Sequence, residues 1–258
     1  MMLHSTITGD GDGPPILLAH GLFGQARNLG GVARRLAQNR RVISVDMRNH
    51  GDSPGDPDHS YAALAGDLAR VIADNGGLAD VAGHSMGGKA AMALALTHPQ
   101  MVRRLVTMDI APVGYGHVQT HLIDAMESLD LTGLERRSEA DRRLAETVEE
   151  PGIRAFLLQS LDLKADPPRW RLNLPVLRDQ MATLVGWPDD LPGSAPYDGP
   201  ALFLIGAESN YVTDDGRAVI RRLFPQARIV AIKGAGHWLH ADAPETTAEA
   251  LAQFFGAA

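Results

Sequence analysis

Short apolar runs alternate with amphipathic stretches along most of this chain. Apolar runs bounded by glycine, proline or polar turn residues predict buried strands, and apolar positions three and four apart predict helices. The predicted strands are residues 3–8, 16–19, 42–45, 78–82, 105–108, 201–205 and 229–232, and the predicted helices are 29–39, 61–75, 85–98, 214–224 and 244–255. This order is typical of an α/β fold with a mostly parallel sheet flanked by helices.

One interval breaks the alternation. No convincing strand run occurs from about residue 113 to 197, whereas helical patterns recur at 122–129, 139–149, 153–161 and 174–185. We therefore expect a core domain of residues 1–112 and 198–258, with a helical cap, 113–197, inserted between two late strands. Ligand sites in open α/β sheets lie at the carboxyl ends of strands, where this insert begins and ends, so a cap is favoured over extra core packing. The apolar residues that either line the site or belong to the core are Leu122, Ile123, Met126, Phe156, Leu157, Trp170, Met181 and Trp187.

Composition limits the class of protein. The 258 residues, 45% of them hydrophobic, suffice for one large core. A net charge of -7 without a long basic run argues against nucleic acid as a partner. The absence of cysteine excludes disulfides, thiolate catalysis and Cys-based zinc sites. The N-terminus lacks the features of a signal peptide, and no apolar stretch has the length of a membrane span, so we expect a cytoplasmic protein that does not bind membranes. The oligomeric state is left open.

The most informative motif is Gly83-His84-Ser85-Met86-Gly87, which reads G-x-S-x-G. It lies between the apolar run 78–82 and a helical pattern that stops at Pro99. Two glycines let a strand reverse sharply into a helix, which lifts the serine hydroxyl clear of the sheet edge. The motif therefore predicts a nucleophile elbow, with Ser85 at the N-terminus of the helix.

A serine hydroxyl needs a general base, because it is almost wholly protonated at neutral pH. In folds with this elbow the chain order is nucleophile, acid, histidine, which excludes the histidines before Ser85. His237 follows the last predicted strand in a glycine-containing loop and is the favoured base, with His240 as the alternative. The remaining histidines are assigned to the end of the elbow helix (His98) and to the insert (His117 and His121).

The acid of the triad is less clearly marked. Many hydrolases with this elbow carry it in the spacing G-x-x-D after the strand that is 201–205 here, yet this chain has Ser209 at that place. Asp109 ends the preceding strand, where its carboxylate can also reach the histidine loop. A triad is defined by geometry rather than by position, so we favour Asp109 and keep Glu208 and Asp214 as alternatives.

The segment 20–24 follows the strand 16–19, which is the position of the loop that helps to form the oxyanion hole in this fold. We call this segment the oxyanion loop. It supplies one backbone N–H in this fold, and the residue after the nucleophile supplies the second. The expected donors are the amides of Leu22 and Met86. The residues expected to contact substrate are Phe23, His84, Leu122, Phe156 and Trp238. No cofactor and no metal is expected, because no group of residues has metal-ligand spacing.

Two further features have structural interpretations. The loop 46–53 contains Arg48 and His50, for which steering of a substrate carboxylate or phosphate is the alternative, but a hydrogen-bonded structural loop is the favoured interpretation. Lys89, near the first turn of the elbow helix, is expected to be a surface or packing cation rather than an acid or base.

Five segments together resemble a known family. They are HGLFG at 20–24, DMRNHGDS at 46–53, GHSMGGK at 83–89, DIAP at 109–112 and GHWLH at 236–240. This set resembles the YbfF-type esterases, which are α/β-hydrolases related to the ABHD11 group, over nearly the whole chain. The resemblance implies an α/β-hydrolase fold, a triad acid at Asp109 and a serine where G-x-x-D would place one. The chain departs from the family in the insert and at Ala207-Glu208, where the family tends to have Gly-Asn.

The function predicted from these parts is that of a serine esterase acting through an acyl-enzyme. The resemblance implies small acyl esters with short chains as substrates, and acyl thioesters such as acyl-CoA as a further class. A cofactor-free perhydrolase or a carbon–carbon bond hydrolase can use the same triad, and a non-catalytic ligand-binding protein can share the fold. An epoxide hydrolase or dehalogenase normally needs an aspartate at the position of Ser85.

Overall fold

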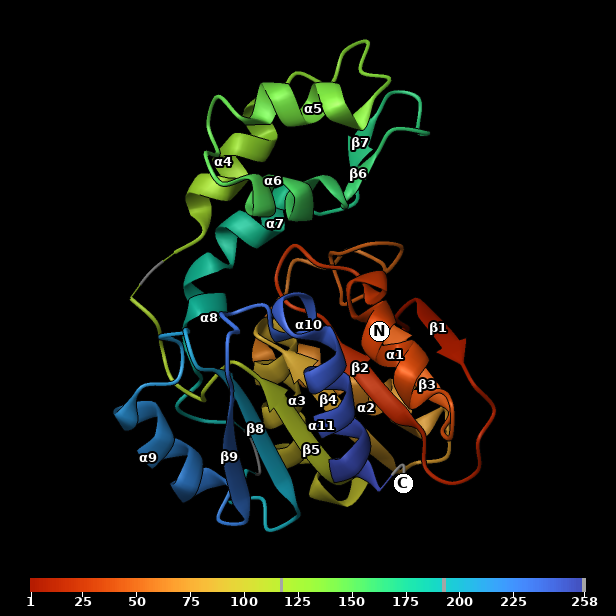
Figure 1. Ribbon diagram of the computed structural model, residues 1–258, viewed down its shortest axis with the longest axis vertical. Coiled ribbons are helices and arrows are strands. Elements are labelled where there is room, and N and C mark those ends of the chain that lie inside the picture. The colour runs from red at the N-terminus through yellow and green to blue at the C-terminus, as the bar shows by residue number, and fades with distance from the viewer. Residues whose placement is uncertain (117, 192–193, 257–258) are drawn as a thin grey trace.

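A seven-stranded sheet forms the centre of the computed structural model, which describes residues 1–116, 118–191 and 194–256 (Figure 1). Its strand order is β1-β3-β2-β4-β5-β8-β9, and every pair of neighbours is parallel except β1 and β3. The predicted α/β fold with a mostly parallel sheet is thus confirmed. The strands are β1 (Ser5–Thr8), β2 (Ile16–Ala19), β3 (Val42–Val45), β4 (Ala79–His84), β5 (Val102–Met108), β8 (Ala201–Gly206) and β9 (Ala227–Ile232).

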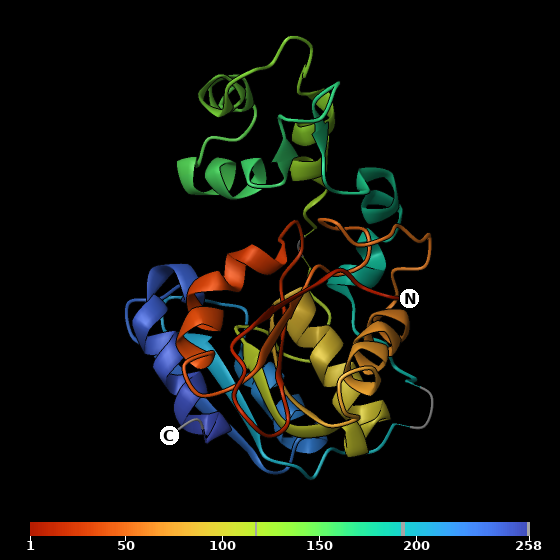
Figure 2. The same cartoon turned by 90° about the vertical axis from the view of Figure 1, so that its right-hand side faces the viewer.

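Helices cover both faces of the sheet. Figure 2 shows α1 (Gly30–Leu36) and α11 (Pro244–Phe255) on one side, with α2 (Tyr61–Ala73) and α3 (Met86–Thr97) on the other. Strand β2 explains why the apolar runs are continuous: Ile16 and Leu18 face the α1 and α11 side, and Leu17 and Ala19 pack with α2 and α3. A strand buried on both faces has no polar side to alternate with. Helix α9 (Asp214–Leu223) adds Ile220 to the same core as α2 and α3.

The segment between β5 and β8 forms an insert that stands above the carboxyl ends of the strands (Figures 1 and 2). Its helices are α4 (Thr120–Ser128), α5 (Arg137–Leu144), α6 (Pro151–Leu158), α7 (Leu174–Asp179) and α8 (Met181–Val185). It also contains an antiparallel pair that the sequence did not predict, β6 (Leu161–Asp162) with β7 (Arg169–Trp170). Pairs of two residues are too short to show a strand period.

Several helix limits differ from the predictions. The single helix expected over 174–185 is two helices with Gln180 between them, and α5 stops at Leu144 although a pattern to 149 was expected. The helix expected from residue 29 is preceded by a 3-10 turn, η1 (Ala26–Leu29). The unpredicted short elements are η2 (Pro99–Met101) and α10 (Leu239–Asp242). His117, assigned to the insert from the sequence, lies outside the described residues. Within 1–116, 118–191 and 194–256, no helix combines the length and apolar character that crossing a membrane requires.

Candidate active site

Ser85 occupies a strained turn between β4 and α3. Its φ of 50° and ψ of -116° lie outside the regions that residues with a side chain normally adopt. A Cβ atom at Gly83 would lie 2.2 Å from the carbonyl oxygen of Gly87, and one at Gly87 would lie 2.4 Å from that of Ala19. Only glycine therefore fits on either side of Ser85, because the strand and the helix approach each other so closely.

His237 and Asp109 extend a hydrogen-bonded chain from Ser85. The Nε2 atom of His237 lies 3.1 Å from the hydroxyl oxygen of Ser85, and its Nδ1 atom lies 2.8 Å from Oδ2 of Asp109. An ionised carboxylate only accepts hydrogen bonds, so Nδ1 carries the proton and Nε2 can accept from the serine hydroxyl. The other acids considered, Glu208 and Asp214, are exposed.

The carboxylate of Asp109 is completely buried, and two donors besides His237 reach it. The backbone N–H of Gly206 donates to Oδ1 at 2.9 Å, and the hydroxyl of Ser209 donates to Oδ2. Ser209 stands where the more common spacing would place the acid itself. In the sequence this serine indicates only that the acid is missing from its usual place, and its contact with Asp109 arises because β8 lies next to β5 in the sheet.

Two further side chains hold His237 in place. The ring of Tyr211 stacks on the imidazole with centroids 3.8 Å apart and an interplanar angle of 15°. His84 donates its Nε2–H to the backbone carbonyl of His237 at 2.9 Å. Burial lowers the pKa of His84 well below its usual value, so this ring is neutral. The alternative base, His240, packs its ring against His84 with centroids 4.7 Å apart.

The residues expected to supply the oxyanion donors are Met86, which directly follows Ser85, and Leu22. Met86 is the first residue of α3, so its N–H has no carbonyl to bind within the helix. Leu22 is in a turn closed by a hydrogen bond of 3.0 Å from the N–H of Gly24 to the carbonyl of Gly21. Leu22, Ser85 and Met86 all line the same cavity.

This cavity has a volume of about 290 Å³ and lies between the carboxyl ends of the strands and the insert. Its wall includes His237 and all five residues that were expected to contact substrate: Phe23, His84, Leu122, Phe156 and Trp238. The sequence did not single out Tyr61, Ile110, Tyr115, Gln119, Ile153, Leu184, Val185 or Tyr211, which also line it. A small apolar space above a hydrogen-bonded serine suits the acyl part of an ester.

Comparisons with known proteins identify the family of the chain. The family model for the alpha/beta hydrolase fold matches residues 14–244. The chain belongs to the α/β-hydrolase family. It is 41% identical to the mouse sn-1-specific diacylglycerol lipase ABHD11, over 97% of this chain and 84% of the relative, and 42% identical to Esterase YbfF of Escherichia coli strain K12, over 93% and 92%. The resemblance found in the sequence is thus confirmed.

The structure of a marine microorganism esterase superimposes on this α/β-hydrolase with a TM-score of 0.92 and 34% identity, covering 98% of this chain and 99% of the other. The two relatives of this chain named above, Esterase YbfF and the diacylglycerol lipase ABHD11, are an esterase and a lipase. This α/β-hydrolase is accordingly a carboxylic ester hydrolase.

Most of the apolar candidates in the insert do not line the cavity of this α/β-hydrolase. Leu122 and Phe156 line it, whereas Ile123, Met126, Leu157, Trp170, Met181 and Trp187 are absent from the wall formed by the described residues. Four of these six are at most 3% exposed and belong to the core. The indole N–H of Trp170 donates to the carbonyl of Met126 at 2.8 Å. Most of these apolar side chains of the insert thus contribute to core packing rather than to the cavity wall.

Lys89 is buried. Of the two roles expected for it, a surface cation is therefore excluded, and a packing cation remains. Its ammonium group donates to the carbonyls of Val185 at 3.1 Å and Gly186 at 2.6 Å. It also lies 4.7 Å from the ring centroid of Tyr115 and 5.5 Å from that of Tyr61. Burial lowers the pKa of Lys89 to about 7. The side chain therefore joins the elbow helix to the end of the insert.

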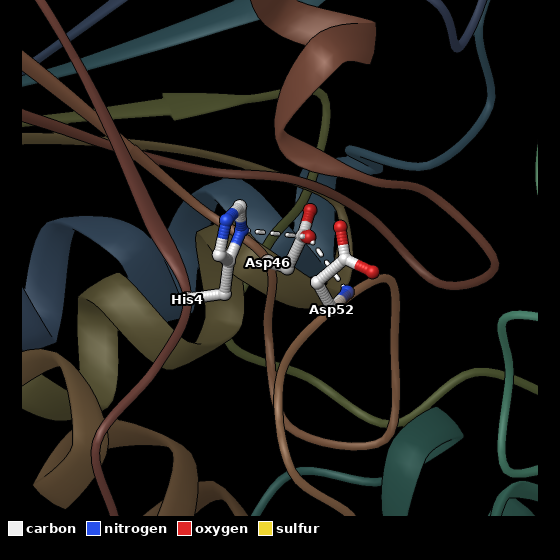
Figure 3. Close-up of side chains that lie close together, drawn as sticks. All are labelled: His4, Asp46 and Asp52. Atoms are coloured by element: carbon white, nitrogen blue, oxygen red, sulfur yellow. Dashed lines mark hydrogen bonds and ion pairs between the residues drawn. The ribbon is translucent and has the colours of Figure 1, made fainter.

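His4, Asp46 and Asp52 form a cluster with the residue types of a metal site (Figure 3). Their other contacts explain the cluster without an ion. One oxygen of the Asp46 carboxylate accepts from the N–H of Ala26 at 2.7 Å, and the other accepts from the N–H of Asp52 at 2.9 Å. Asp52 in turn pairs with Arg171 at 2.8 Å. The Asp46 carboxylate thus helps to fold the loop after β3, and that of Asp52 joins this loop to the insert.

The loop 46–53 is hydrogen-bonded and mostly buried, in agreement with its structural interpretation. Arg48 is 6% exposed, and its Nε atom lies 2.6 Å from Oδ2 of Asp67 on α2. A Cβ atom at Gly51, whose φ is 59°, would lie 2.2 Å from the carboxylate of Asp46. His50 is also buried, and its ring contacts the oxyanion loop.

Proposed function

We propose that this chain is a serine esterase that hydrolyses short-chain carboxylic esters through an acyl-enzyme. The observation that carries the proposal is the chain of hydrogen bonds from Ser85 through His237 to Asp109 on the floor of an apolar cavity. An unassisted serine hydroxyl is a poor nucleophile, whereas one that donates to a neutral imidazole can lose its proton as it attacks.

In the first half of the reaction, Ser85 Oγ attacks the ester carbonyl carbon and its proton passes to His237 Nε2. The buried carboxylate of Asp109 stabilises the imidazolium that forms. When the tetrahedral intermediate collapses, the bond to the leaving oxygen breaks and His237 returns the proton to the alcohol. Water then attacks the acyl-enzyme by the same route, which releases the acid and restores the serine.

The amides of Leu22 and Met86 receive the negative charge that develops on the carbonyl oxygen. Backbone donors are already oriented and need no reorganisation during the reaction, which is why one such donor is worth roughly a hundred- to a thousandfold in rate. The position of Met86 at the N-terminus of α3 adds the favourable end of the helix dipole.

Short acyl chains are inferred from the size of the cavity. A volume of about 290 Å³ is at the low end of ligand pockets, and Leu122, Phe156 and Trp238 narrow it with large side chains. We assign residues 113–197 as a cap on a core formed by 1–112 and 198–258, since Leu122 and Phe156 come from the insert. Only the acyl group has to enter, so acyl thioesters are a second class of substrate, with His237 protonating sulfur instead of oxygen.

Two measurements test the proposal. A fluorophosphonate should add one phosphonyl group to the protein, detected by intact mass, and no group to Ser85→Ala. A panel of p-nitrophenyl esters from acetate to palmitate, with acyl-CoA thioesters beside it, should give the highest kcat/KM at the short esters. Failure of the native protein to form an adduct, or an adduct that persists in Ser85→Ala, would exclude nucleophilic catalysis by Ser85.

A further inference from the structure

The turn that carries Leu22 has an unusual residue at its third position. Gly21 and Gly24 close the turn, and Phe23 has a φ of 62°, a value that glycine adopts much more readily. Phe23 is only 3% exposed. A backbone in this region persists when its surroundings hold it there.

His50 binds the N–H of Phe23. The Nδ1 atom of His50 lies 2.8 Å from the carbonyl oxygen of Arg48, which can only accept, so Nδ1 carries the proton. The Nε2 atom is then free to accept, and the N–H of Phe23 donates to it at 3.2 Å. Burial lowers the pKa of His50 well below its usual value, which keeps the ring neutral.

Ser160, in the insert, binds the backbone carbonyl of Phe23. Its hydroxyl donates to the oxygen of Phe23 at 2.8 Å, and it accepts a hydrogen bond of 2.9 Å from Nε2 of Gln25. Ser160 is completely buried and Gln25 is 4% exposed. Ser160 follows α6 in the insert, whereas Phe23 lies in the loop that follows β2, a strand of the central sheet. The hydrogen bond therefore joins the insert to this loop.

The contacts that His50 and Ser160 make with Phe23 belong to one network of hydrogen bonds. His50 and Leu172 form an antiparallel bridge, in which the N–H of Gly51 donates to the carbonyl of Arg171 at 2.8 Å. The N–H of Arg171 then donates to the carbonyl of Ser160, also at 2.8 Å. Main-chain hydrogen bonds thus connect the loop 46–53 with the insert, and the side chains of His50 and Ser160 connect both to the oxyanion loop.

We propose that His50 and Ser160 are positioning residues that hold Phe23 from both sides, so that docking of the insert fixes the conformation of the turn that presents the Leu22 N–H. The inference rests on the proposed function, in which that N–H binds the oxyanion. The Leu22 N–H lies in the preceding peptide group, so the two residues act on it through the shape of the turn. Rotation of the peptide group between Leu22 and Phe23 changes ψ of Leu22 and φ of Phe23 and so converts one turn type into another. It would point the carbonyl of Leu22 at the lone pair of His50 Nε2, which is repulsive, and would cost the hydrogen bond to Phe23.

The first test compares Ser160→Ala with Ser128→Ala. Ser128 also lies in the insert and donates to a backbone carbonyl, that of Ala125 at 3.1 Å, but within its own helix. A misplaced oxyanion donor affects the transition state more than bound substrate, so Ser160→Ala should lower kcat by about tenfold and leave KM within twofold. The inhibition constant of a trifluoromethyl ketone, whose adduct with Ser85 carries an oxyanion, should rise by the same factor. Ser128→Ala should change none of these values.

The second test uses the chemistry of His50. His50→Phe removes the acceptor for the Phe23 N–H and should lower kcat roughly 10- to 100-fold, whereas the side-chain carbonyl of His50→Gln should recover part of the loss. His98→Gln is the control, because His98 bonds to Thr97, at the far end of α3. If His50→Phe does not fold, Ser160→Ala decides alone.

Unchanged kcat in Ser160→Ala, or a loss of kcat without a matching loss of affinity for the ketone, would overturn the proposal. So would a fall in thermal stability as the only effect. These outcomes are distinct from failure of the proposed function, in which the native protein itself neither hydrolyses esters nor forms an adduct at Ser85.

Discussion

The hydroxyl of Ser209 donates to Oδ2 of Asp109, which is the same oxygen that accepts the Nδ1–H of His237. Ser209, at the usual place of a triad acid, therefore binds Asp109, the candidate acid at the end of the neighbouring strand β5. Ser209 adds a neutral donor to a carboxylate that also accepts from the N–H of Gly206. The three donors hold one orientation of the carboxylate, and that orientation points Oδ2 at the imidazole.

Replacing Asp109 by asparagine should nearly abolish turnover. The amide can present an N–H to Nδ1, which would favour the tautomer of His237 with its proton on Nε2, unable to accept from Ser85. In a comparable triad this change costs about 10⁴ in kcat, and we expect a loss of that order. The measurement is kcat on p-nitrophenyl acetate, with Glu208→Gln as the control because Glu208 is exposed. Near-native turnover of Asp109→Asn together with loss in Glu208→Gln would move the acid to Glu208.

Ser209→Ala should have a smaller effect than loss of Asp109, because His237 keeps its carboxylate partner. Removing one of the three donors frees the carboxylate to rotate, so we expect kcat to fall by about tenfold. Ser209→Thr, which keeps the hydroxyl, should restore most of the rate. Equal losses in the alanine and threonine variants would mean that the hydroxyl is not the important group.

The sequence predicted the sheet well where burial is determined by the strand itself. Strands 16–19 and 42–45 match the predicted ranges because apolar residues that fill both faces leave a continuous run. The elbow was also predictable, since close approach at Gly83 and Gly87 admits no other residue. The pair β6 and β7 was not, because its pairing is set by the insert around it.

The parts of the site that were missed depend on contacts between distant segments. Lys89 is buried because its ammonium group meets the carbonyls of Val185 and Gly186, which lie at the end of the insert. Ser209 reaches a carboxylate 100 residues earlier in the chain. Local patterns identify which residues have useful chemistry, but they do not report which of them meet in the folded protein.

Phe156→Ala should shift the preference toward longer acyl chains. Phe156 lines the cavity from the insert, and its ring centroid lies 5.9 Å from that of Trp238. Its removal opens space for several methylene groups, so kcat/KM on the octanoate ester relative to the acetate ester should rise by roughly tenfold. Phe254→Ala on α11, outside the cavity wall, is the control and should leave the ratio unchanged. An unchanged ratio in Phe156→Ala would place the acyl chain elsewhere.

Lys89→Met should destabilise the protein. The methionine fills much of the same volume but leaves the carbonyls of Val185 and Gly186 without their donor, which costs about 1–3 kcal/mol per buried group. Urea unfolding measures the loss, and Lys233→Met, an exposed site, provides the control. A stability equal to that of the native protein would show that water replaces the ammonium group.

Acid should destabilise the folded protein between about pH 6.5 and 4, in part through His59. Burial lowers the pKa of His59 to about 4, and its Nδ1 accepts a hydrogen bond of 2.9 Å from Nδ2 of Asn49, which a protonated ring cannot accept. Between these pH values the unfolded chain binds more protons at this residue than the folded chain. Stability therefore rises with pH through the window and falls as the pH drops, by up to about 3 kcal/mol for this group. The free energy of unfolding in urea, measured from pH 4 to 7, should give a shallower slope for His59→Gln than for the native protein, by as much as one proton. Identical slopes would mean that His59 titrates normally in the folded state and that other groups cause the acid sensitivity.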